Sequence, residues 1–511
     1  MDQVTLARWQ FGITTVYHYL FVPITIAMAT LVALLQTFWY RTGNDRYLQL
    51  TKFFGKLFLI NFALGVVTGI VQEFQFGMNW SEYSRFVGDI FGAPLALEAL
   101  LAFFMESTFI GLWIFGWDRL PKPLHLMSIW LAAIGTAFSA AFILGANAWM
   151  QNPVGSVFNI ENGRAELDGV GGFLNLWTNP VFLSSFPHTI FAAFMVGAGI
   201  VAGISFWHLA RTNKRIADGD STVARDDVDT WRWATKFGAW VLLIASLGTA
   251  LTGDFLSKAM TDAQPMKMAA AEGLTETTTN APFSVLTIGD LNGENITPII
   301  EIPGLLSWLA GHETVEGIKD LNEKFAEEGF TRQDGSKLPL QEEVYAAIQN
   351  GEVSPELEKS YMDLNITPNI PISYWTFRLM IGVGMAGAAL AALMLLALRK
   401  KDFTPMPSKL ITLNAWAIPL LPLAANAFGW IFTEMGRQPW IVAGVLPVET
   451  AVSPSVSAGS VLFSLIVFTL LYGALAVLEL FLFLKFTKKG LPDVTPVELH
   501  DDPNEPVSFA Y

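Results

Sequence analysis

The sequence contains no cysteine, and charged residues occupy only 15% of its 511 positions. Without thiols the chain can form neither disulfides nor iron–sulfur clusters, and it cannot attach a c-type haem covalently. A soluble domain carries about a quarter charged residues, because its surface must face water. The formal net charge of −14 argues against nucleic acid as a partner. These shortages exclude a disulfide-stapled or nucleic-acid-binding soluble protein.

Hydrophobic residues make up 52% of the chain and gather in runs long enough to cross a bilayer. A helix needs about 20 apolar residues to span a hydrocarbon core of roughly 30 Å. These runs are too long for barrel strands, and a spanning backbone must satisfy its hydrogen bonds internally. We therefore predict an all-α, polytopic membrane protein of about nine transmembrane helices with a large outer-side loop. The predicted spans are 16–39, 53–74, 94–115, 126–148, 187–209, 233–252, 375–398, 410–432 and 461–486.

The hydrophilic stretches divide the chain into four parts. Residues 1–252 hold the first six spans and an outer loop at 149–186 that is rich in Gly, Asn and Pro. Residues 253–374 form the largest hydrophilic region, where we expect a folded lid or binding segment, since a structureless loop of this length would be unusual. Residues 375–486 hold the last three spans, and 487–511 form a tail.

Lysine and arginine follow the odd-numbered spans, as at Arg119 and Lys122, and are sparse in the short linkers after even-numbered ones. Because these residues favour the cytoplasmic side, we expect the N-terminus outside and the C-terminal tail in the cytoplasm.

Two of the six histidines, His18 and His188, lie near the outer end of a span. A lone histidine in a membrane often only hydrogen-bonds within the bundle, so neither is decisive alone. The others are expected to be interfacial or to lie in loops: His125, His208, His312 and His500.

Carboxylates in the spans are stronger candidates, because a carboxylate in hydrocarbon costs several kcal/mol unless it is paired, hydrated or bound to a metal. Glu98 and Glu106 fall in the third span, and Glu434 just follows the eighth. In an α-helix, eight residues correspond to about 12 Å of rise and about 80° of rotation. Glu98 and Glu106 are therefore expected to share one broad face and could form a proton relay.

The predicted orientation of the spans places several of these groups at the same depth in the membrane. His18, Glu98, His188, Met380 and Glu434 come from five spans, and all are expected near the outer face. Histidine and methionine are an axial pair for six-coordinate haem, and histidine or carboxylate can bind a haem that keeps an open site. The pattern favours a multi-haem site, although a methionine in a membrane helix most often only packs.

Two other classes remain as alternatives. A solute transporter also uses membrane carboxylates, but it predicts internal repeats and broken helices, and no repeat is evident here. A bis-histidine electron carrier needs paired histidines on facing helices, and only two histidines lie in the span interiors.

Six segments carry a resemblance to a known family. Together they strongly resemble subunit I of the cytochrome bd-type quinol oxidases, in the family's order across all nine spans. The segments are RWQFGITTVYHYLFVP from Arg8, EFQFGMNWSEYSRFVGDIFGAPLALEALLAFFMEST from Glu73, ANAWMQNPVG from Ala146, FPHT from Phe186, YWTFRLM from Tyr374 and GWIFTEMGRQPW from Gly429.

The resemblance implies two haem b groups, one low-spin and one high-spin, and one haem d. His188 and Met380 match the ligands of the low-spin haem, His18 that of one high-spin haem, and Glu434 that of the other. Which high-spin position holds haem d stays open. The remaining matches are Glu98 beside the high-spin pair, Arg378 and Arg437 near haem propionates, and Trp430 between haems.

The resemblance also implies the reaction and its partners. Glu106 and Ser107, with Ser139, match a proton-uptake path, and Lys267 and Glu272 match the quinol-binding residues of the outer loop. The expected activity is quinol oxidation at the outer face and O2 reduction to water with cytoplasmic protons, which generates proton motive force without pumping. Expected partners are subunit II, small single-helix subunits and quinol, in a bacterial cytoplasmic membrane.

Overall fold

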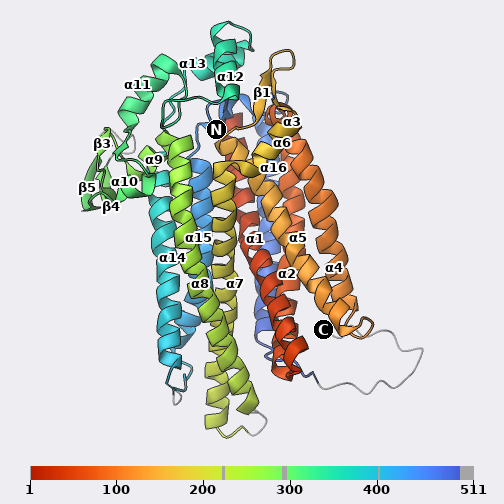
Figure 1. The fold of residues 1–511 in the computed structure, drawn as a ribbon. Coiled ribbons are helices and arrows are strands. Elements are labelled where there is room, and N and C mark those ends of the chain that lie inside the picture. Colours follow the sequence, from red (N-terminus) through yellow and green to blue (C-terminus); the bar gives the residue numbers. More distant parts are fainter. Residues whose placement is uncertain (1, 221–224, 290–295, 401–402, 495–511) are drawn as a thin grey trace.

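The computed structural model describes residues 2–220, 225–289, 296–400 and 403–494. His500 and most of the expected tail lie outside the described residues. The chain forms one elongated bundle of long helices, and shorter elements cover the end of the bundle where the N-terminus lies (Figure 1).

Nine helices in the described part of the chain are long and apolar enough to cross a membrane, which confirms the predicted class. They extend beyond the predicted windows, because an apolar window marks only the part that lies in hydrocarbon. The segment between the sixth and seventh spans is accordingly shorter than the predicted 253–374. The nine are α1 (Gln3–Thr42), α2 (Asp45–Met78), α3 to α4 (Ser81–Phe115), α5 (Lys122–Gln151), α7 (Pro180–Ala217), α8 (Arg225–Ala263), α14 (Ile370–Leu398), α15 (Lys409–Met435) and α16 (Ala458–Thr487).

The third span contains a π-helical segment that the sequence did not predict. It consists of α3 (Ser81–Leu97), the π-helix η1 (Glu98–Phe103) and α4 (Phe104–Phe115). A π-helix bonds residue i to i+5 and shifts the phase of everything that follows. The predicted rotation between Glu98 and Glu106 was therefore wrong in detail, since it assumed a continuous α-helix.

Helices α1 and α7 form the centre of the bundle, with 67% and 72% of their apolar windows buried. The α3–α4 span and α16 are at the periphery, where only 17% is buried. Gly199 and Gly203 of α7 pack directly on α15, since a Cβ at either would lie within 2.6 Å of a backbone oxygen of that helix. Small residues at such positions allow two membrane helices to approach closely.

The described segments that join the helices at the N-terminal end, 152–179, 264–289, 296–369 and 436–457, form what we call the cap. Its strands pair as four antiparallel two-stranded sheets, β1–β2, β3–β6, β4–β5 and β7–β8. Trp440, Tyr361 and Phe330 form part of its apolar core. The strands are β1 (Ser156–Asn159), β2 (Arg164–Leu167), β3 (Thr278–Thr279), β4 (Phe283–Gly289), β5 (Ile296–Ile302), β6 (Thr314–Val315), β7 (Trp440–Val442) and β8 (Leu446–Pro447); the helices are α6 (Gly169–Thr178), α9 (Pro265–Glu272), α10 (Leu305–Ala310), α11 (Ile318–Glu328), α12 (Pro339–Gln349), α13 (Pro355–Met362) and the 3₁₀ turn η2 (Val448–Thr450).

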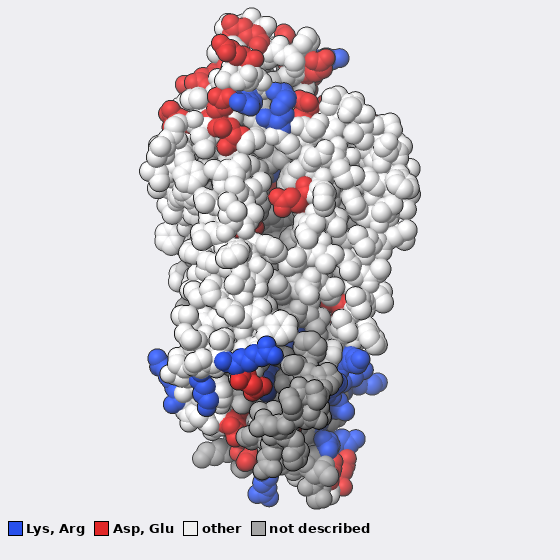
Figure 2. Space-filling model, turned by 90° about the vertical axis from the view of Figure 1, so that its right-hand side faces the viewer, with Lys and Arg blue, Asp and Glu red and all other residues white. Residues whose placement is uncertain are grey.

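Charge divides along the long axis of the molecule. Figure 2 shows a broad, almost uncharged band across the bundle, acidic residues mainly on the cap, and lysine and arginine gathered mainly at the opposite end. The band has the character expected of a surface that faces lipid.

Candidate functional site

The tautomer of His18, on α1, is fixed by a threonine of α2. Its Nδ1 lies 2.9 Å from Oγ1 of Thr68, and that hydroxyl donates its only proton to the backbone oxygen of Gly65 at 2.9 Å. The threonine oxygen can therefore only accept from the histidine, so Nδ1 carries the proton. The lone pair is left on Nε2, which is the state that a metal-binding imidazole requires.

His188, on α7, reaches the same state by a different contact. Its Nδ1 lies 3.0 Å from the backbone oxygen of Thr249 on α8. A carbonyl can only accept a hydrogen bond, so Nδ1 is the donor and Nε2 again keeps its lone pair.

Each of three candidate ligands faces a glycine on another helix. A Cβ at Gly69 would lie 3.1 Å from Cε1 of His18, and one at Gly253 would lie 3.2 Å from Cε1 of His188. The third glycine is Gly429 of α15, where a Cβ would lie 2.9 Å from the sulfur of Met380, on α14. Any larger residue would displace these side chains, so the glycines leave room for the ligands to be oriented.

The two histidines near the opposite end of the bundle are engaged differently. His125 accepts from Nε2 of Gln36 at 2.8 Å and donates through its own Nε2 to the oxygen of Trp113 at 2.8 Å. His208 donates through Nε2 to the oxygen of Thr487 at 2.7 Å. These contacts support the structural role that the sequence favoured for both.

Glu434 sits at the cap end of α15 between two donors. Its Oε1 accepts from Nδ2 of Asn147 at 2.9 Å, and its Oε2 accepts from Nη2 of Arg437 at 2.5 Å. Nε and Nη1 of Arg437 and the indole nitrogen of Trp430 are buried and have no partner among the described residues. Trp430 also stacks on Tyr19, with ring centroids 4.8 Å apart. Unpaired buried donors beside a carboxylate suit an acidic ligand group.

Glu98 and Glu106 both lie against one face of α5. Oε1 of Glu98 accepts from the hydroxyl of Ser139 at 2.7 Å. A Cβ at Gly135, one turn from Ser139, would lie 2.9 Å from Cγ of Glu106. Ser107 is not brought to them: it is exposed on the outside of the bundle, and its hydroxyl bonds the oxygen of Phe104 in its own helix.

Lys267 lies near one end of α9, a short cap helix in which every residue is buried. Its Nζ donates to Oε1 of Gln151 at 3.1 Å and to the oxygen of Thr433 at 2.9 Å, beside Glu434. Burial, with the nearby Arg437 charge, lowers the pKa of Lys267 to about 7. At neutral pH only a fraction of Lys267 is therefore protonated.

Glu272 ends α9 and forms a buried ion pair with Arg378 of α14. Its Oε2 accepts from Nη2 of Arg378 at 2.7 Å. Burial raises the pKa of Glu272 to about 7, although the arginine and the backbone N–H of Ser284 act in the opposite direction. The other oxygen, Oε1, is buried and has no partner among the described residues.

The guanidinium of Arg378 is fully engaged on the cap side. Its nitrogens bond the backbone oxygens of Ser284, Ala271 and Tyr374 as well as Glu272. The structure thus joins Arg378 to the expected quinol residue Glu272, and Arg437 to Glu434. Contact of Arg378 with a haem propionate stays a prediction.

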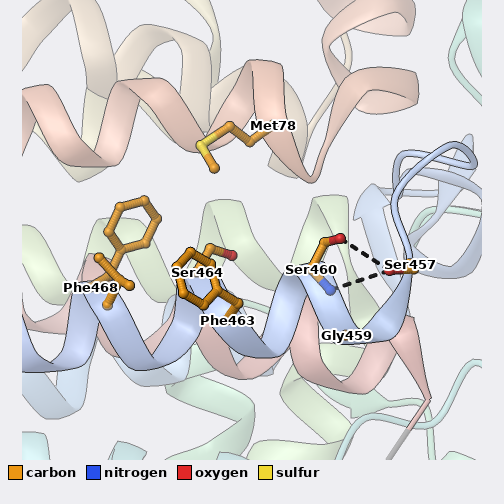
Figure 3. A pocket seen from close by; sticks show the side chains of 8 residues that line it. Met78, Ser457, Gly459, Ser460, Phe463, Ser464 and Phe468 are labelled. Atoms are coloured by element: carbon orange, nitrogen blue, oxygen red, sulfur yellow. Dashed lines mark hydrogen bonds between the residues drawn. The ribbon is translucent and has the colours of Figure 1, made fainter.

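A shallow surface groove lies apart from these residues, between α2 and the cap end of α16. Figure 3 shows Met78 of α2 on one side and Phe463, Ser464 and Phe468 of α16 on the other. Its lining contains no acid or base, so it is not a candidate for the chemistry.

A family model described as cytochrome bd terminal oxidase subunit I matches residues 6–491. The chain belongs to this family. It is similar to subunit 1 of the cytochrome bd ubiquinol oxidase of Bacillus subtilis, with 42% identity over 96% of this chain and 94% of the relative. It is also similar to subunit 1 of the cytochrome bd-II ubiquinol oxidase of Escherichia coli, with 37% identity over 96% and 97% of the two chains. The structure of the bd oxidase from Geobacillus thermodenitrificans matches with a TM-score of 0.76 and 25% identity, covering 95% of this chain and 98% of that one.

As a cytochrome bd subunit I, the chain is part of a terminal quinol oxidase, a multi-pass bacterial membrane protein with haem cofactors and a subunit II partner. The residues fit haem. Two histidines keep the Nε2 lone pair that a metal ligand needs, and a methionine sulfur faces a glycine. The buried N–H groups of Arg437 that have no partner among the described residues can bind acidic substituents of the haem.

Sequence reasoning missed the residues that orient the ligands, chiefly Thr68, Thr249 and Asn147. Each is a polar residue or a backbone carbonyl on a neighbouring helix. The available signal was a hydrogen-bonding side chain within an otherwise apolar span, and that signal does not say which residue it contacts.

Proposed function

We propose that this chain oxidises quinol beside α9 and passes the electrons to haems that reduce O2 with protons taken from the opposite side of the membrane. One observation carries the proposal. The expected quinol residues lie near and at the end of a single buried helix, and Lys267 bonds the residue next to the haem-ligand candidate Glu434. Quinol oxidation and haem reduction would then be close neighbours.

The haem assignment follows the matched residues. His188 and Met380 would hold the low-spin haem b, His18 one high-spin haem, and Glu434 the other, with one of these two being haem d. Arg437 and Trp430 would bond haem carboxylates with their buried N–H groups. Bound haem supplies electron transfer at the low-spin position and O2 reduction at an open coordination position.

Quinol oxidation needs acceptors for both hydroxyl protons. Glu272 is suited to this because its pKa of about 7 lets it accept a proton and release it near neutral pH. Lys267 near the other end of α9 can donate a hydrogen bond to a quinol oxygen while it is charged, and Glu272 can accept the two protons in turn. The position of α9 in the cap would send these protons to the cap side.

Protons for O2 reduction would come through α4 and η1. Glu106 and Glu98 both face α5, and Ser139 bonds Glu98, so a proton could pass from one carboxyl to the next towards the cap-end haems. Ser107 would contribute only if a neighbouring chain covers it, since it faces out of the bundle.

Membrane orientation makes this chemistry vectorial. The lysine- and arginine-rich end opposite the cap supports a cytoplasmic location for that end, with the cap and N-terminus outside. Each charge that crosses the membrane stores about 2.3 kcal/mol per 100 mV. Proton release by quinol oxidation outside and proton uptake for O2 reduction from inside would therefore generate proton motive force without a pump.

Subunit II and small single-helix subunits would contact the peripheral helices. The α3–α4 span and α16 bury least of their apolar surface within this chain, which supports them as the faces available to partners or lipid.

The test is quinol-driven proton release in oriented vesicles that contain the purified complex. We expect a reduced-minus-oxidised spectrum with both b- and d-type haem, and one proton released on the cap side for each electron. Release of additional protons would indicate a pump, and release on the opposite side would overturn the placement of the quinol site.

A further inference from the structure

The β4–β5 hairpin of the cap exposes apolar side chains on both of its faces. Ile288 is 66% exposed, and the neighbours Ile299 and Ile300 are each about half exposed. Successive residues of a strand point to opposite faces, so Ile299 and Ile300 expose the two sides of β5. A hairpin in water normally keeps one polar face, and an exposed apolar strand tends to aggregate. The hairpin therefore requires apolar surroundings.

The hairpin lies beside the cap ends of the long apolar helices rather than at the far tip of the cap. In Figure 1 it projects sideways with α10 beside the cap end of α14, below α11 and α13. Helix α10 packs on α8, whose outer stripe is apolar and exposed along its length. The stripe consists of Trp240, Ile244, Leu247, Leu251 and Phe255.

A tryptophan and a lysine mark the end of this stripe. Lys258 follows Phe255 by less than one turn, and its Nζ lies 5.1 Å from the ring centroid of Trp308 on α10. Trp308 itself is 59% exposed. Exposed tryptophan and snorkelling lysine are typical of the lipid headgroup level. The apolar surface of the bundle thus continues into α10 and the hairpin.

The base of the hairpin is bonded to the Glu272–Arg378 pair. The backbone N–H of Ser284, on β4, donates to Oε2 of Glu272 at 3.1 Å, and the oxygen of Ser284 accepts from Nε of Arg378 at 2.8 Å. The phenol of Tyr374 bonds Thr287, further along β4, at 3.1 Å. One strand therefore runs from the buried ion pair to the exposed isoleucines.

We propose that the β4–β5 hairpin inserts its apolar side chains into the cap-side leaflet and guides the tail of a lipophilic quinol to Glu272. The partner of this surface is the acyl region of the bilayer. Insertion rests on exposure and position alone, whereas guidance also rests on the proposed quinol site. Glu301 is the one charged residue in the described parts of the two strands, and it pairs opposite Ser284 at the base, close to the bundle. Between Ser284 and Ile300 the described residues of the two strands carry no charge, and the joining residues 290–295, which include Asp290 and Glu294, lie outside the described part of the chain.

Insertion can be measured with spin labels, because this chain has no native cysteine. The Ile288→Cys and Ile300→Cys complexes each carry one nitroxide on this subunit. They are measured in phospholipid vesicles without reductant. The unsubstituted complex, treated with the same label, gives the background signal. The matched control is Ile160→Cys, since Ile160 is similarly exposed in the turn between β1 and β2. We expect hairpin labels to collide more with O2 than with a water-soluble nickel chelate, and the control label to show the reverse. Preference for the chelate, or exclusion of both probes by a covering protein, would overturn insertion.

Guidance is tested with quinols that differ only in their tails. Ile288→Asp and Ile300→Asp should raise KM for a long-tailed quinol in vesicles about tenfold, from lost apolar burial, and leave KM for a tail-free quinol unchanged. Ile160→Asp should change neither. An equal effect on both quinols, or on neither, would overturn guidance. If Glu272→Gln keeps wild-type turnover, the quinol site itself is misplaced, while the label result still decides insertion.

Discussion

The phenol of Tyr472, on α16, donates a 2.9 Å hydrogen bond to the backbone oxygen of Thr68, the residue whose hydroxyl accepts from His18. A peripheral helix of the bundle is thereby tied to the segment that sets the tautomer of a haem-ligand candidate. Groups that hold a ligating histidine in this way are typically worth about 10- to 100-fold in metal affinity or activity.

Thr68→Val should therefore weaken the haem at His18. Valine keeps the shape but cannot accept from Nδ1, so the ring loses its fixed tautomer. We expect an altered or reduced high-spin signal, about 10- to 100-fold lower oxidase activity and an intact low-spin signal. Thr51→Val is the matched control, because Thr51 is also buried on α2 and bonds only its own helix. Equal spectra for the two variants would contradict this role of Thr68.

His188→Ala and Met380→Leu should each abolish the low-spin haem signal and quinol oxidase activity, because each would remove one of the two proposed ligands of that haem. A high-spin signal should survive, since the proposed high-spin ligands His18 and Glu434 lie on other helices. The control is His208→Gln, which changes a buried histidine whose ring hydrogen-bonds Thr487 alone among the described residues. Optical spectra of the purified complexes decide the matter, and an unchanged low-spin spectrum in both ligand variants would remove the assignment.

The two ends of α9 should impose opposite pH dependences on quinol oxidation. The pKa of Glu272 is raised to about 7, so its ionised, proton-accepting form grows as pH rises through that value. The pKa of Lys267 is lowered to about 7, so its charged, donating form is lost over the same range. A requirement for both forms gives a bell-shaped rate profile near pH 7.

Glu272→Gln should remove the acid limb of that profile, and Lys267→Ala the alkaline limb, each with a lower maximum rate. Haem content should remain normal in Glu272→Gln, because its contacts are Arg378 and Ser284. Steady-state rates with quinol across about two pH units on either side of neutrality provide the measurement. Profiles that keep both limbs in both variants would show that neither residue titrates in this step.

The helix count and order could be predicted because apolar length and basic flanks are local properties of the sequence. The ends of the helices could not be predicted in this way, since α8 and α14 continue past their apolar windows into the cap. The burial of α9 could not be predicted from the sequence either. Its residues lie in a hydrophilic segment with a lysine and a glutamate, yet both charges point inward to Gln151 and Arg378.

Candidate ligands could be named from the sequence, whereas the residues that contact them could not. His188 and Met380 were matched by resemblance, but Thr249 and Gly429 contact them across helix boundaries that one sequence does not reveal. The role of Ser107 stays a prediction, because this chain alone leaves its side chain exposed. Glu106 and Ser107 are consecutive in α4, and consecutive residues of an α-helix are rotated by about 100°, so adjacency in sequence does not place both on one face.

The last prediction concerns Glu106, which is buried where α4 packs on α5. No arginine or lysine among the described residues forms an ion pair with it. Glu106→Gln keeps the size of the side chain but cannot carry a proton, so it should slow O2 reduction and its coupled charge movement by about 10²- to 10⁴-fold. Haem reduction by quinol should change less, because those protons leave near α9. Glu98→Gln should also perturb the high-spin spectrum, since Glu98 lies nearer the cap.

Time-resolved charge movement in vesicles separates this path from a structural role. Ser107→Ala provides a comparison from the next residue, whose hydroxyl faces away from the bundle. Slow uptake in Glu106→Gln with wild-type uptake in Ser107→Ala would place the path along α5, between Gly135 and Ser139. Wild-type uptake in Glu106→Gln would remove this residue from the path, because a glutamine cannot relay a proton by ionising. Slow uptake in both variants would instead mean that a neighbouring chain completes the path at the outer surface of α4.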